Sequence, residues 1–254
     1  MLRACIFTVV ALAIAAGSAQ ADQIGPIGTY YLTDYINLTN FGSSLDAIQG
    51  NTYVQNPSIF QQQEGPIAVF NNLGVLRTAG YQYTNSGGEY APVPSLTVSP
   101  TGPIYTNTWQ NDLYYDSTTN GTSNFLVGLL NGNVLATSTT FGGTPTILFN
   151  THETEDLGIT YDATNNSLWI QNNQTGRITD YTLTGQVITS FAATPGTNGA
   201  TALAMDVDHT LWYDLYGAGT IEHYSTTGTF LGSAHYAGLG YAFGGEIGGQ
   251  QVTP

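Results

Sequence analysis

The chain has 254 residues, of which 17 are acidic and only three are basic, so its formal net charge at pH 7 is −14. A chain this acidic repels nucleic-acid phosphates and anionic lipid surfaces, so we expect neither as a partner. The single cysteine is Cys5, in the N-terminal segment. We therefore expect no disulfide, thiol nucleophile or thiolate metal site in the body of the chain.

Residues 1–21 have the layout of a secretory signal peptide. Arg3 supplies a positive charge, residues 6–16 form an apolar run, and Ala19-Gln-Ala21 is a cleavage signal. The apolar run is shorter than the roughly 20 residues that a membrane helix needs, although an uncleaved anchor is the alternative. We expect cleavage near Ala21, a single mature domain over residues 22–254 without a transmembrane segment, and export from the cell.

The rest of the chain consists of short apolar or alternating runs between turn signals. Asn71-Asn-Leu-Gly74, Asn85-Ser-Gly-Gly88 and Thr226-Thr-Gly228 are examples of these turns. No segment beyond residue 21 shows sustained helical spacing of apolar residues. The pattern predicts an all-β chain.

Two consecutive segments, residues 158–191 and 202–232, repeat each other. Each contains four short strand-like runs. The matching pairs are Trp169 and Trp212, Gly176 and Gly219, Tyr181 and Tyr224, and Gly185 and Gly228. A unit of four strands that recurs at a fixed period predicts a β-propeller.

The number of blades follows from the innermost strands. Positions equivalent to Ile159 recur in steps of 44 to 46 residues, and they are Ile67, Leu113, Ile159, Leu203 and Ile247. Five inner strands predict five blades, with six as the alternative if the irregular region 67–105 holds another sheet. Because no strands can follow the last one, we expect this C-terminal strand to close the ring by pairing with N-terminal strands in residues 29–55, which would remove an open edge.

Large aromatic residues occupy one matching position in the second strand of three repeats. These residues are Phe125, Trp169 and Trp212. A shared position in each repeat is what a shared core requires, so we expect them to pack between blades. Contact with a ligand is the alternative.

The repeat resembles a known group of exported proteins. Gly158-Ile-Thr-Tyr-Asp162, Ser167-Leu-Trp169 and Asp180-Tyr-Thr-Leu-Thr-Gly185 resemble NHL/SMP-30-like repeats of secreted bacterial propellers, especially a group that often carries a PEP-CTERM sorting signal. The resemblance implies a propeller in the bacterial envelope or outside the cell, and it implies no particular activity. The chain ends at Gln250-Gln-Val-Thr-Pro254 without that signal, so the alternatives are that a sorting tail has been trimmed or that this member is released.

Carboxylates precede several of the expected inner strands. The set is Glu64, Asp112, Glu155, Asp156 and Glu246. In propellers, loops that lead into inner strands converge at the mouth of the central channel, where ligands bind. Converging oxygens suit Ca²⁺ or another divalent cation. SMP-30-like enzymes hold a divalent metal there, so the resemblance implies Glu64, Asp156 and Glu246 as tentative ligands. The alternative is that these residues are solvated turn positions.

His152-Glu-Thr-Glu-Asp156 is the densest group of titratable residues. His152 beside carboxylates has the chemistry of a general base or a metal ligand. A solvated acidic loop is the simpler interpretation. The other histidines, among them His209 and His223, are expected at the surface. No residue is assigned a catalytic role.

We therefore predict a secreted, non-catalytic propeller that binds a ligand at the channel mouth or serves in the cell envelope or extracellular matrix. The partner would be a glycan, a protein or a small molecule, and the chain is expected to be a monomer. An SMP-30-like metal-dependent hydrolase or lactonase is the first alternative. A carbohydrate-binding propeller, for which the 17 tyrosines would be suited, is the second.

Overall fold

The computed structural model describes residues 25–37, 42–55, 67–70, 76–79, 86–87, 89–92, 98–100, 105–106, 112, 114–139, 143–193, 201–215 and 219–248. Side chains are described in 25–32, 46–55, 112, 114–139, 143–193, 202–215, 219–240 and 242–248. In these ranges every regular element is a strand, β1 to β22, and no helix suited to crossing a membrane occurs. The signal-peptide prediction for residues 1–21 lies outside them.

The strands form five four-stranded sheets and one two-stranded sheet. The first four-stranded sheet joins β22 (Tyr241–Gly248), β1 (Thr29–Asn37), β2 (Gly42–Gln49) and β3 (Thr52–Val54). The second joins β4 (Ile67–Phe70), β5 (Leu76–Ala79), β7 (Glu89–Pro92) and β8 (Val98–Pro100). The two-stranded sheet joins β6 (Ser86–Gly87) and β9 (Tyr105–Thr106).

The other three sheets follow the chain without a crossover. They are β10 (Ser117–Thr119), β11 (Asn124–Val127), β12 (Asn133–Thr137) and β13 (Thr146–Asn150); β14 (Asp156–Asp162), β15 (Ser167–Asn172), β16 (Arg177–Thr182) and β17 (Val187–Ala192); and β18 (Thr201–Met205), β19 (Thr210–Leu215), β20 (Thr220–Ser225) and β21 (Phe230–His235). Within each sheet, the neighbouring strands are antiparallel.

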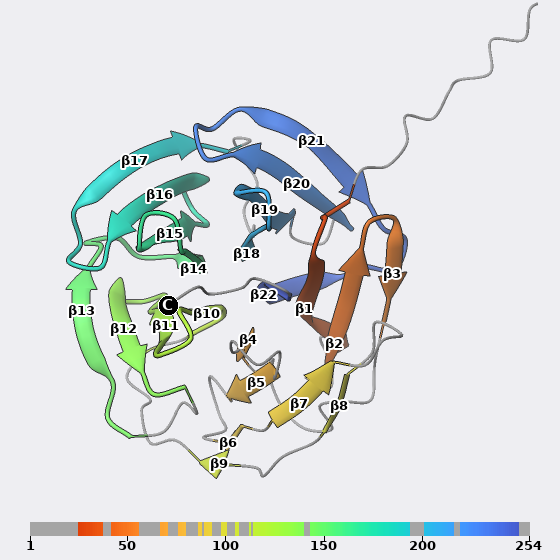
Figure 1. Ribbon diagram of the computed structural model, residues 1–254, viewed down its shortest axis with the longest axis horizontal. Helices are drawn as coiled ribbons and strands as arrows, with labels where there is room; N and C mark the ends of the chain where they lie inside the picture. Colours follow the sequence, from red (N-terminus) through yellow and green to blue (C-terminus); the bar gives the residue numbers. More distant parts are fainter. Residues whose placement is uncertain are drawn as a thin grey trace, which may run out of the picture.

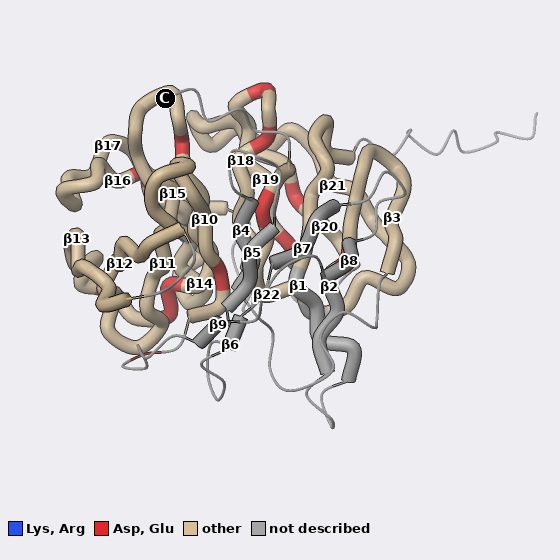
Figure 2. Tube along the Cα trace, turned by 60° about the horizontal axis from the view of Figure 1, so that its bottom comes forward, with Lys and Arg blue, Asp and Glu red and all other residues tan. Residues whose placement is uncertain are grey.

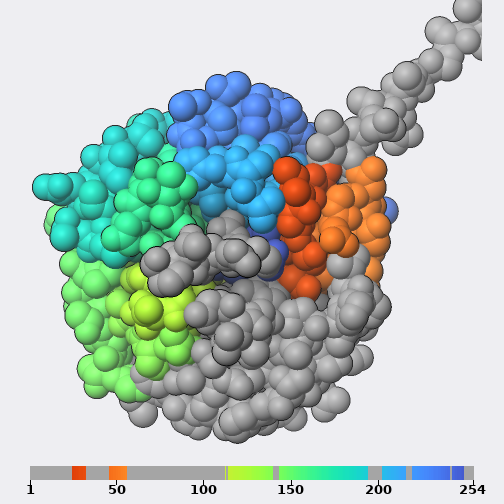
Figure 3. All heavy atoms as spheres, in the orientation of Figure 1, coloured from red at the N-terminus to blue at the C-terminus, as the bar shows by residue number. Residues whose placement is uncertain are grey.

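The sheets surround one axis, with β22, β4, β10, β14 and β18 innermost (Figure 1). The prediction of an all-β propeller is confirmed. Four sheets with described side chains, those of β1, β10, β14 and β18, are clear blades. Figure 3 shows them side by side around the ring, from green through blue to orange.

The ring closes as the sequence predicts. The last strand, β22, pairs with β1 in an antiparallel register that places Glu246 opposite Tyr31 and Ile247 opposite Tyr30. One sheet is thus built from both ends of the described chain. Closure gives β1 a partner on both of its edges, so that β22 becomes the innermost strand of this blade.

The predicted packing of the matched aromatic residues is confirmed. Phe125, Trp169 and Trp212 face Thr118, Thr160 and Ala204 across equivalent strand pairs. All three are at most 2% exposed, and each belongs to a core cluster with residues of the following blade. Burial of these side chains between blades contributes about 1.5–3 kcal/mol each.

Two of the matched glycines allow close contact between blades. Gly185 and Gly228 have positive φ angles of 84° and 83°, in turns before outer strands. A Cβ atom at Gly185 would lie 2.7 Å from Cβ of Phe149, and one at Gly228 would lie 2.6 Å from Cβ of Phe191. The repeated glycine therefore meets both a conformational and a steric requirement.

Neighbouring blades are also joined by a repeated aspartate at the end of the inner strand. Asp206 accepts hydrogen bonds from the backbone N–H groups of Ile27 (2.7 Å) and Gly28 (2.9 Å) in the next blade. Its equivalent, Asp162, lies 2.7 Å from Nε2 of His209 in the blade that follows it. We call this side of the ring, where inner strands end, the distal face, and the side where they begin the proximal face.

Candidate functional site

The predicted proximal-face carboxylate Asp112 stabilises a turn. It is 6% exposed, and its two oxygens accept the backbone N–H groups of Leu130 (2.8 Å) and Asn131 (3.2 Å). Those residues form the connection between β11 and β12. Asp112 therefore has a structural role in holding its own blade together.

Asp156 stabilises the start of β14. Its carboxylate accepts hydrogen bonds from the hydroxyl of Thr151 (2.6 Å) and the side-chain amide of Asn172 (2.9 Å). Burial raises the pKa of Asp156 to about 6, against the effect of these two donors. Thr151 follows β13 of the preceding blade, whereas Asn172 lies on β15 of the same blade as Asp156, so Asp156 joins the two blades at the proximal face.

His152 and Glu155 both have left-handed backbone conformations, with φ angles of 63° and 68°. His152 is exposed, and its N–H donates to the side-chain oxygen of Asn150. The N–H of Glu155 donates to the carbonyl of Leu129 at 2.7 Å. Glu155 and Asp112 therefore both contact the turn between β11 and β12. Among the described contacts, His152 makes no hydrogen bond with either residue.

The proposed metal ligands Glu64, Asp156 and Glu246 stay a prediction, because Glu64 lies outside the described residues. Within the described side chains, no group of three His, Cys, Asp or Glu residues is placed to hold a metal ion. Asp156 and Glu246 lie at different levels of the ring. Ile159 and Gly245 lie at the same height along the ring axis, because both donate a hydrogen bond to Asp116. Asp156 precedes Ile159 by three residues, which is roughly 10 Å along a strand.

Glu246 does not precede an inner strand, as the sequence predicted, but lies inside β22. The reason for the difference is the glycine pair at 244 and 245, a sequence that usually signals a turn. Here a Cβ atom at Gly245 would lie 2.6 Å from Cε2 of Tyr30 and 3.0 Å from Cβ of Ala202. Glycine lets this strand approach its neighbours closely, so the pair continues the strand.

A second set of polar residues is grouped around the hydroxyl of Tyr30, on which the charges of three carboxyl groups act. It consists of Tyr30, Asp116, Asp214 and Glu246, which we call the axial group. Asp116 is fully buried, and its carboxylate accepts backbone N–H groups of Ser117, Ile159 and Gly245, each at 2.9 Å. These donors belong to β10, β14 and β22, so one side chain joins three inner strands.

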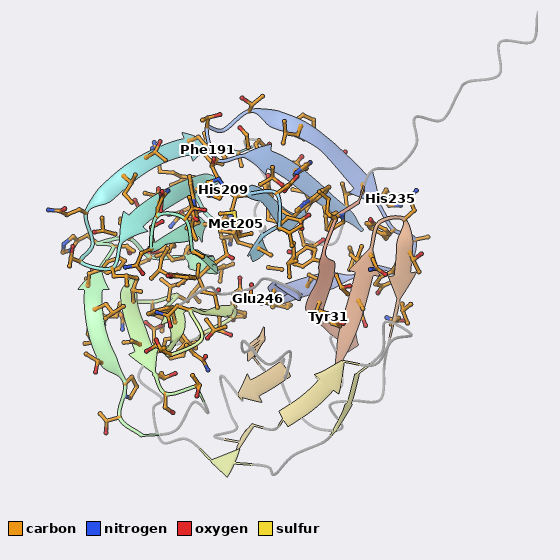
Figure 4. All side chains as sticks on the ribbon, in the orientation of Figure 1. Tyr31, Phe191, Met205, His209, His235 and Glu246 are labelled. Carbon is orange, nitrogen blue, oxygen red and sulfur yellow. The ribbon has the colours of Figure 1, made fainter. Side chains whose placement is uncertain are left out.

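Glu246 has one carboxyl oxygen without a hydrogen bond. It is 7% exposed, and its Oε2 atom has no hydrogen-bond partner. Burial raises the pKa of Glu246 to about 8, although donors from Thr118, Ile247 and Thr119 oppose the shift. At neutral pH this carboxyl is therefore mostly protonated. Figure 4 shows Glu246 near the middle of the ring, beside Tyr31 on β1.

The hydroxyl of Tyr30 is the second unpartnered group. Tyr30 is fully buried and its OH makes no hydrogen bond. Burial raises the pKa of Tyr30 well above its usual value, and the nearby charges of Asp116, Asp214 and Glu246 raise it further. The phenol therefore lies among the three carboxyl groups. Asp116 also has a raised pKa, first because of burial and in part because of Glu246.

Sequence reasoning missed Tyr30 and Asp116. The strand register offers one signal for Asp116. Asp116 lies two residues before the residue opposite Phe125, and Gly158 and Ala202 lie two residues before the residues opposite Trp169 and Trp212. An aspartate where other blades have small apolar residues indicates a special role. Acidic residues are otherwise scattered along the described chain (Figure 2).

Comparisons with known proteins bear on the fold. No family model and no curated protein matches the chain. A chain of the nidogen/laminin complex is similar in structure, with a TM-score of 0.59 and 11% identity over 88% of this chain and 100% of that one. Virginiamycin B lyase from Staphylococcus aureus matches with a TM-score of 0.49 and 16% identity, over 84% and 68%. The periplasmic gluconolactonase of Pseudomonas aeruginosa matches with 0.46 and 10%, over 84% and 69%.

At these identities the likeness concerns the fold alone. The expectations about export, a PEP-CTERM relationship and ligands are not addressed by it.

Proposed function

We propose that this chain is an exported, monomeric, five-bladed propeller that binds a ligand without transforming it, and that the ligand contacts the axial group. The observation that supports a binding site is the pair of unpartnered polar atoms, Oε2 of Glu246 and the hydroxyl of Tyr30. The five four-stranded sheets support five blades. Residues 1–21 support export, and a mature N-terminus near Asp22 would test it.

Unpartnered polar atoms in the interior favour a polar ligand. Each buried donor or acceptor without a partner costs about 1–3 kcal/mol. A hydroxyl group of a ligand both donates and accepts, so it can satisfy Tyr30 and the protonated carboxyl of Glu246 at once. The ligand class that fits best is therefore a neutral, hydroxyl-bearing molecule such as a sugar or a polyol.

The other carboxylates already take part in structural hydrogen bonds, which supports a role in binding instead of catalysis. Asp116 is occupied by three backbone donors, Asp112 holds a turn of its own blade, and Asp156 holds the connection between two blades. These contacts give each of the three groups a structural task. Oε2 of Glu246, in contrast, has no hydrogen-bond partner.

The test is a thermal-unfolding screen of the purified mature chain against neutral sugars and polyols at pH 7, alongside turnover assays with lactones and esters. A ligand of the axial group raises the melting temperature, and Glu246→Ala or Tyr30→Phe abolishes the shift. Glu153→Ala, on the proximal loop, should leave it unchanged. Lactone or ester turnover that is lost in Glu246→Ala would instead establish the hydrolase alternative.

A further inference from the structure

Two aromatic side chains meet between blades that are not neighbours. Tyr115 lies directly before Asp116, and Phe243 lies on β22. Their ring centroids are 5.3 Å apart, with an angle of 33° between the planes. The sheet of β4 stands between those of β10 and β22 around the ring (Figure 1). We call these two residues the aromatic pair.

The aromatic pair differs from the aromatic contacts that hold the blades together. Phe149 meets Tyr181, and Phe191 meets Tyr224, so each contact joins one blade to the next along the chain. Contacts that repeat in this way are what a shared core requires. Among the described ring contacts, the aromatic pair is the one that joins blades separated by a third.

Phe243 is the extra residue of a β-bulge. Gly244 lies opposite Thr33 of β1 and Ala242 lies opposite Asp34, so Phe243 has no residue opposite it. Bulges change the direction of a side chain, and they are frequent beside functional sites. Here the bulge occurs where β22 brings Phe243 to Tyr115.

The aromatic pair lies next to the axial group, on its proximal side. The N–H of Gly245 donates to Asp116 at 2.9 Å, which places these two residues at one height. Tyr115 precedes Asp116 by one residue, and Phe243 precedes Gly245 by two. Because inner strands begin on the proximal face, both aromatic residues are nearer to that face.

The exposure of the two segments also changes at the aromatic pair. Tyr115 and Phe243 are both half-buried, and the residues directly before and after each of them are buried. Asp116 is fully buried, and Glu246 is 7% exposed. A ligand that approaches the axial group from the proximal face therefore meets the two aromatic rings first.

The phenol of Tyr30 lies close to the same place. A Cβ atom at Gly245 would lie 2.6 Å from Cε2 of Tyr30, so the ring of Tyr30 packs against β22 at that glycine. Phe243 is two residues away, which is roughly 7 Å along a strand. Gly244 and Gly245 separate Phe243 from Glu246 and carry no side chains. One sugar-sized ligand can therefore contact both the aromatic pair and the axial group.

We propose that the aromatic pair is a stacking surface for a sugar ring whose hydroxyl groups bind the axial group. This inference rests on the proposed function and narrows its ligand from any polyol to a cyclic carbohydrate. The C–H face of a sugar ring is apolar and packs on the electron-rich face of an aromatic ring. Its hydroxyl groups lie at the edge of the ring, where they can meet Tyr30 and Glu246. An open-chain polyol has the hydroxyl groups but lacks the flat apolar face.

The test compares ring and open-chain forms of the same sugars. Methyl glucoside, methyl galactoside and methyl mannoside are titrated calorimetrically into the purified mature chain at pH 7, alongside sorbitol, galactitol and mannitol. We expect at least one pyranoside to bind about tenfold more tightly than its open-chain counterpart, because only the ring stacks.

Variants locate the preference at the aromatic pair. Phe243→Leu and Tyr115→Leu, which stay apolar but lose the aromatic face, should each weaken pyranoside binding by about tenfold and leave open-chain binding unchanged. Phe243→Trp should retain the preference, and the emission of the added tryptophan should change with the same pyranoside dependence. The matched control is Phe230→Leu, because Phe230 is an aromatic residue of β21 that is 52% exposed.

The outcomes separate this inference from the proposed function. Open-chain polyols that bind as tightly as pyranosides, with both lost in Glu246→Gln, would overturn the stacking surface and leave the axial site standing. Pyranoside binding that is unchanged in both leucine variants would also overturn it. Pyranoside binding that is lost in Phe243→Leu but unchanged in Glu246→Gln would instead contradict the axial site. No binding of any of the six compounds would overturn both.

Discussion

The carboxylate of Asp116 accepts the backbone N–H of Gly245, 129 positions later in the chain, at 2.9 Å. The same side chain binds Ile159 and its own neighbour Ser117. One buried aspartate therefore joins inner strands that come from different parts of the ring. It fixes the relative height of these strands and so places Glu246, the next residue after Gly245, on the axis.

Asp116→Asn should destabilise the chain. The amide retains one acceptor oxygen and presents an NH₂ group to a backbone donor, so at least one buried N–H loses its partner. The free energy of unfolding should fall by about 1–3 kcal/mol, as measured by urea denaturation. The control is Asp208→Asn, because Asp208 is exposed and bonds only the nearby hydroxyl of Thr210 in the described contacts. Equal stability of the two variants would contradict the role of Asp116.

Gly228→Ala should be more harmful than Gly143→Ala. Both glycines have similar positive φ angles, 83° and 79°, so the conformational cost is matched. At Gly228 an added Cβ would also lie 2.6 Å from Cβ of Phe191, whereas at Gly143 it would meet nothing within 4 Å. We expect an additional loss of about 1–3 kcal/mol from overpacking at Gly228. Similar melting temperatures would show that blade contact at this glycine is loose.

The stability of the chain should fall as the pH rises from 7 to about 8.5. The pKa of Glu246 is raised from 4.5 to about 8 in the folded chain, so between these values the folded state binds more protons than the unfolded state. Its contribution is fully present below pH 4.5 and is lost as the pH rises through 8. Melting temperatures across this range test the sign.

Glu246→Gln should flatten this pH dependence, because glutamine stays neutral. The pKa of Asp156, raised to about 6, also makes the stability fall as the pH rises, but over a lower pH range. Asp156 therefore does not interfere above pH 7. A melting temperature that rises between pH 7 and 8.5, or a fall of equal size in Glu246→Gln, would contradict the assignment.

Protonation of His223 should change the fluorescence of Trp212. The two rings stack in parallel, with centroids 3.9 Å apart and an angle of 4° between planes. Burial lowers the pKa of His223 from its usual 6.5, against the charges of Asp208 and Asp206. Tryptophan emission should therefore titrate with a midpoint below 6.5. His223→Gln should abolish the transition and His209→Gln should retain it; the reverse pattern would refute the pairing.

The sequence predicted the ring well because its repeats carry the packing. The matched positions of Phe125, Trp169 and Trp212 and the glycines before the outer strands correspond to contacts between blades. The histidines were harder. His223, expected at the surface, is half-buried against Trp212, and His209 reaches a buried aspartate of the neighbouring blade. Such contacts depend on which blades are neighbours, and residue type does not report this.

The candidate site was predicted less well than the fold. Carboxylates that precede inner strands drew attention to Asp112 and Asp156, which stabilise turns. The axial group depends instead on the glycine run that brings β22 against Tyr30, and a glycine pair in a sequence indicates a turn more often than a strand. The position of Asp116 could have been found from its register, since equivalent residues in other blades are small and apolar.

The most direct test of the proposed function is ligand binding to the axial group. A hydroxyl-bearing compound found in the thermal screen is titrated calorimetrically into the wild type, Glu246→Gln, Tyr30→Phe and the control Glu153→Ala. We predict binding by the wild type and the control, and a loss of about 1–3 kcal/mol in each axial variant, the cost of an unsatisfied partner. Equal affinity in all four proteins would contradict a ligand site on the axis.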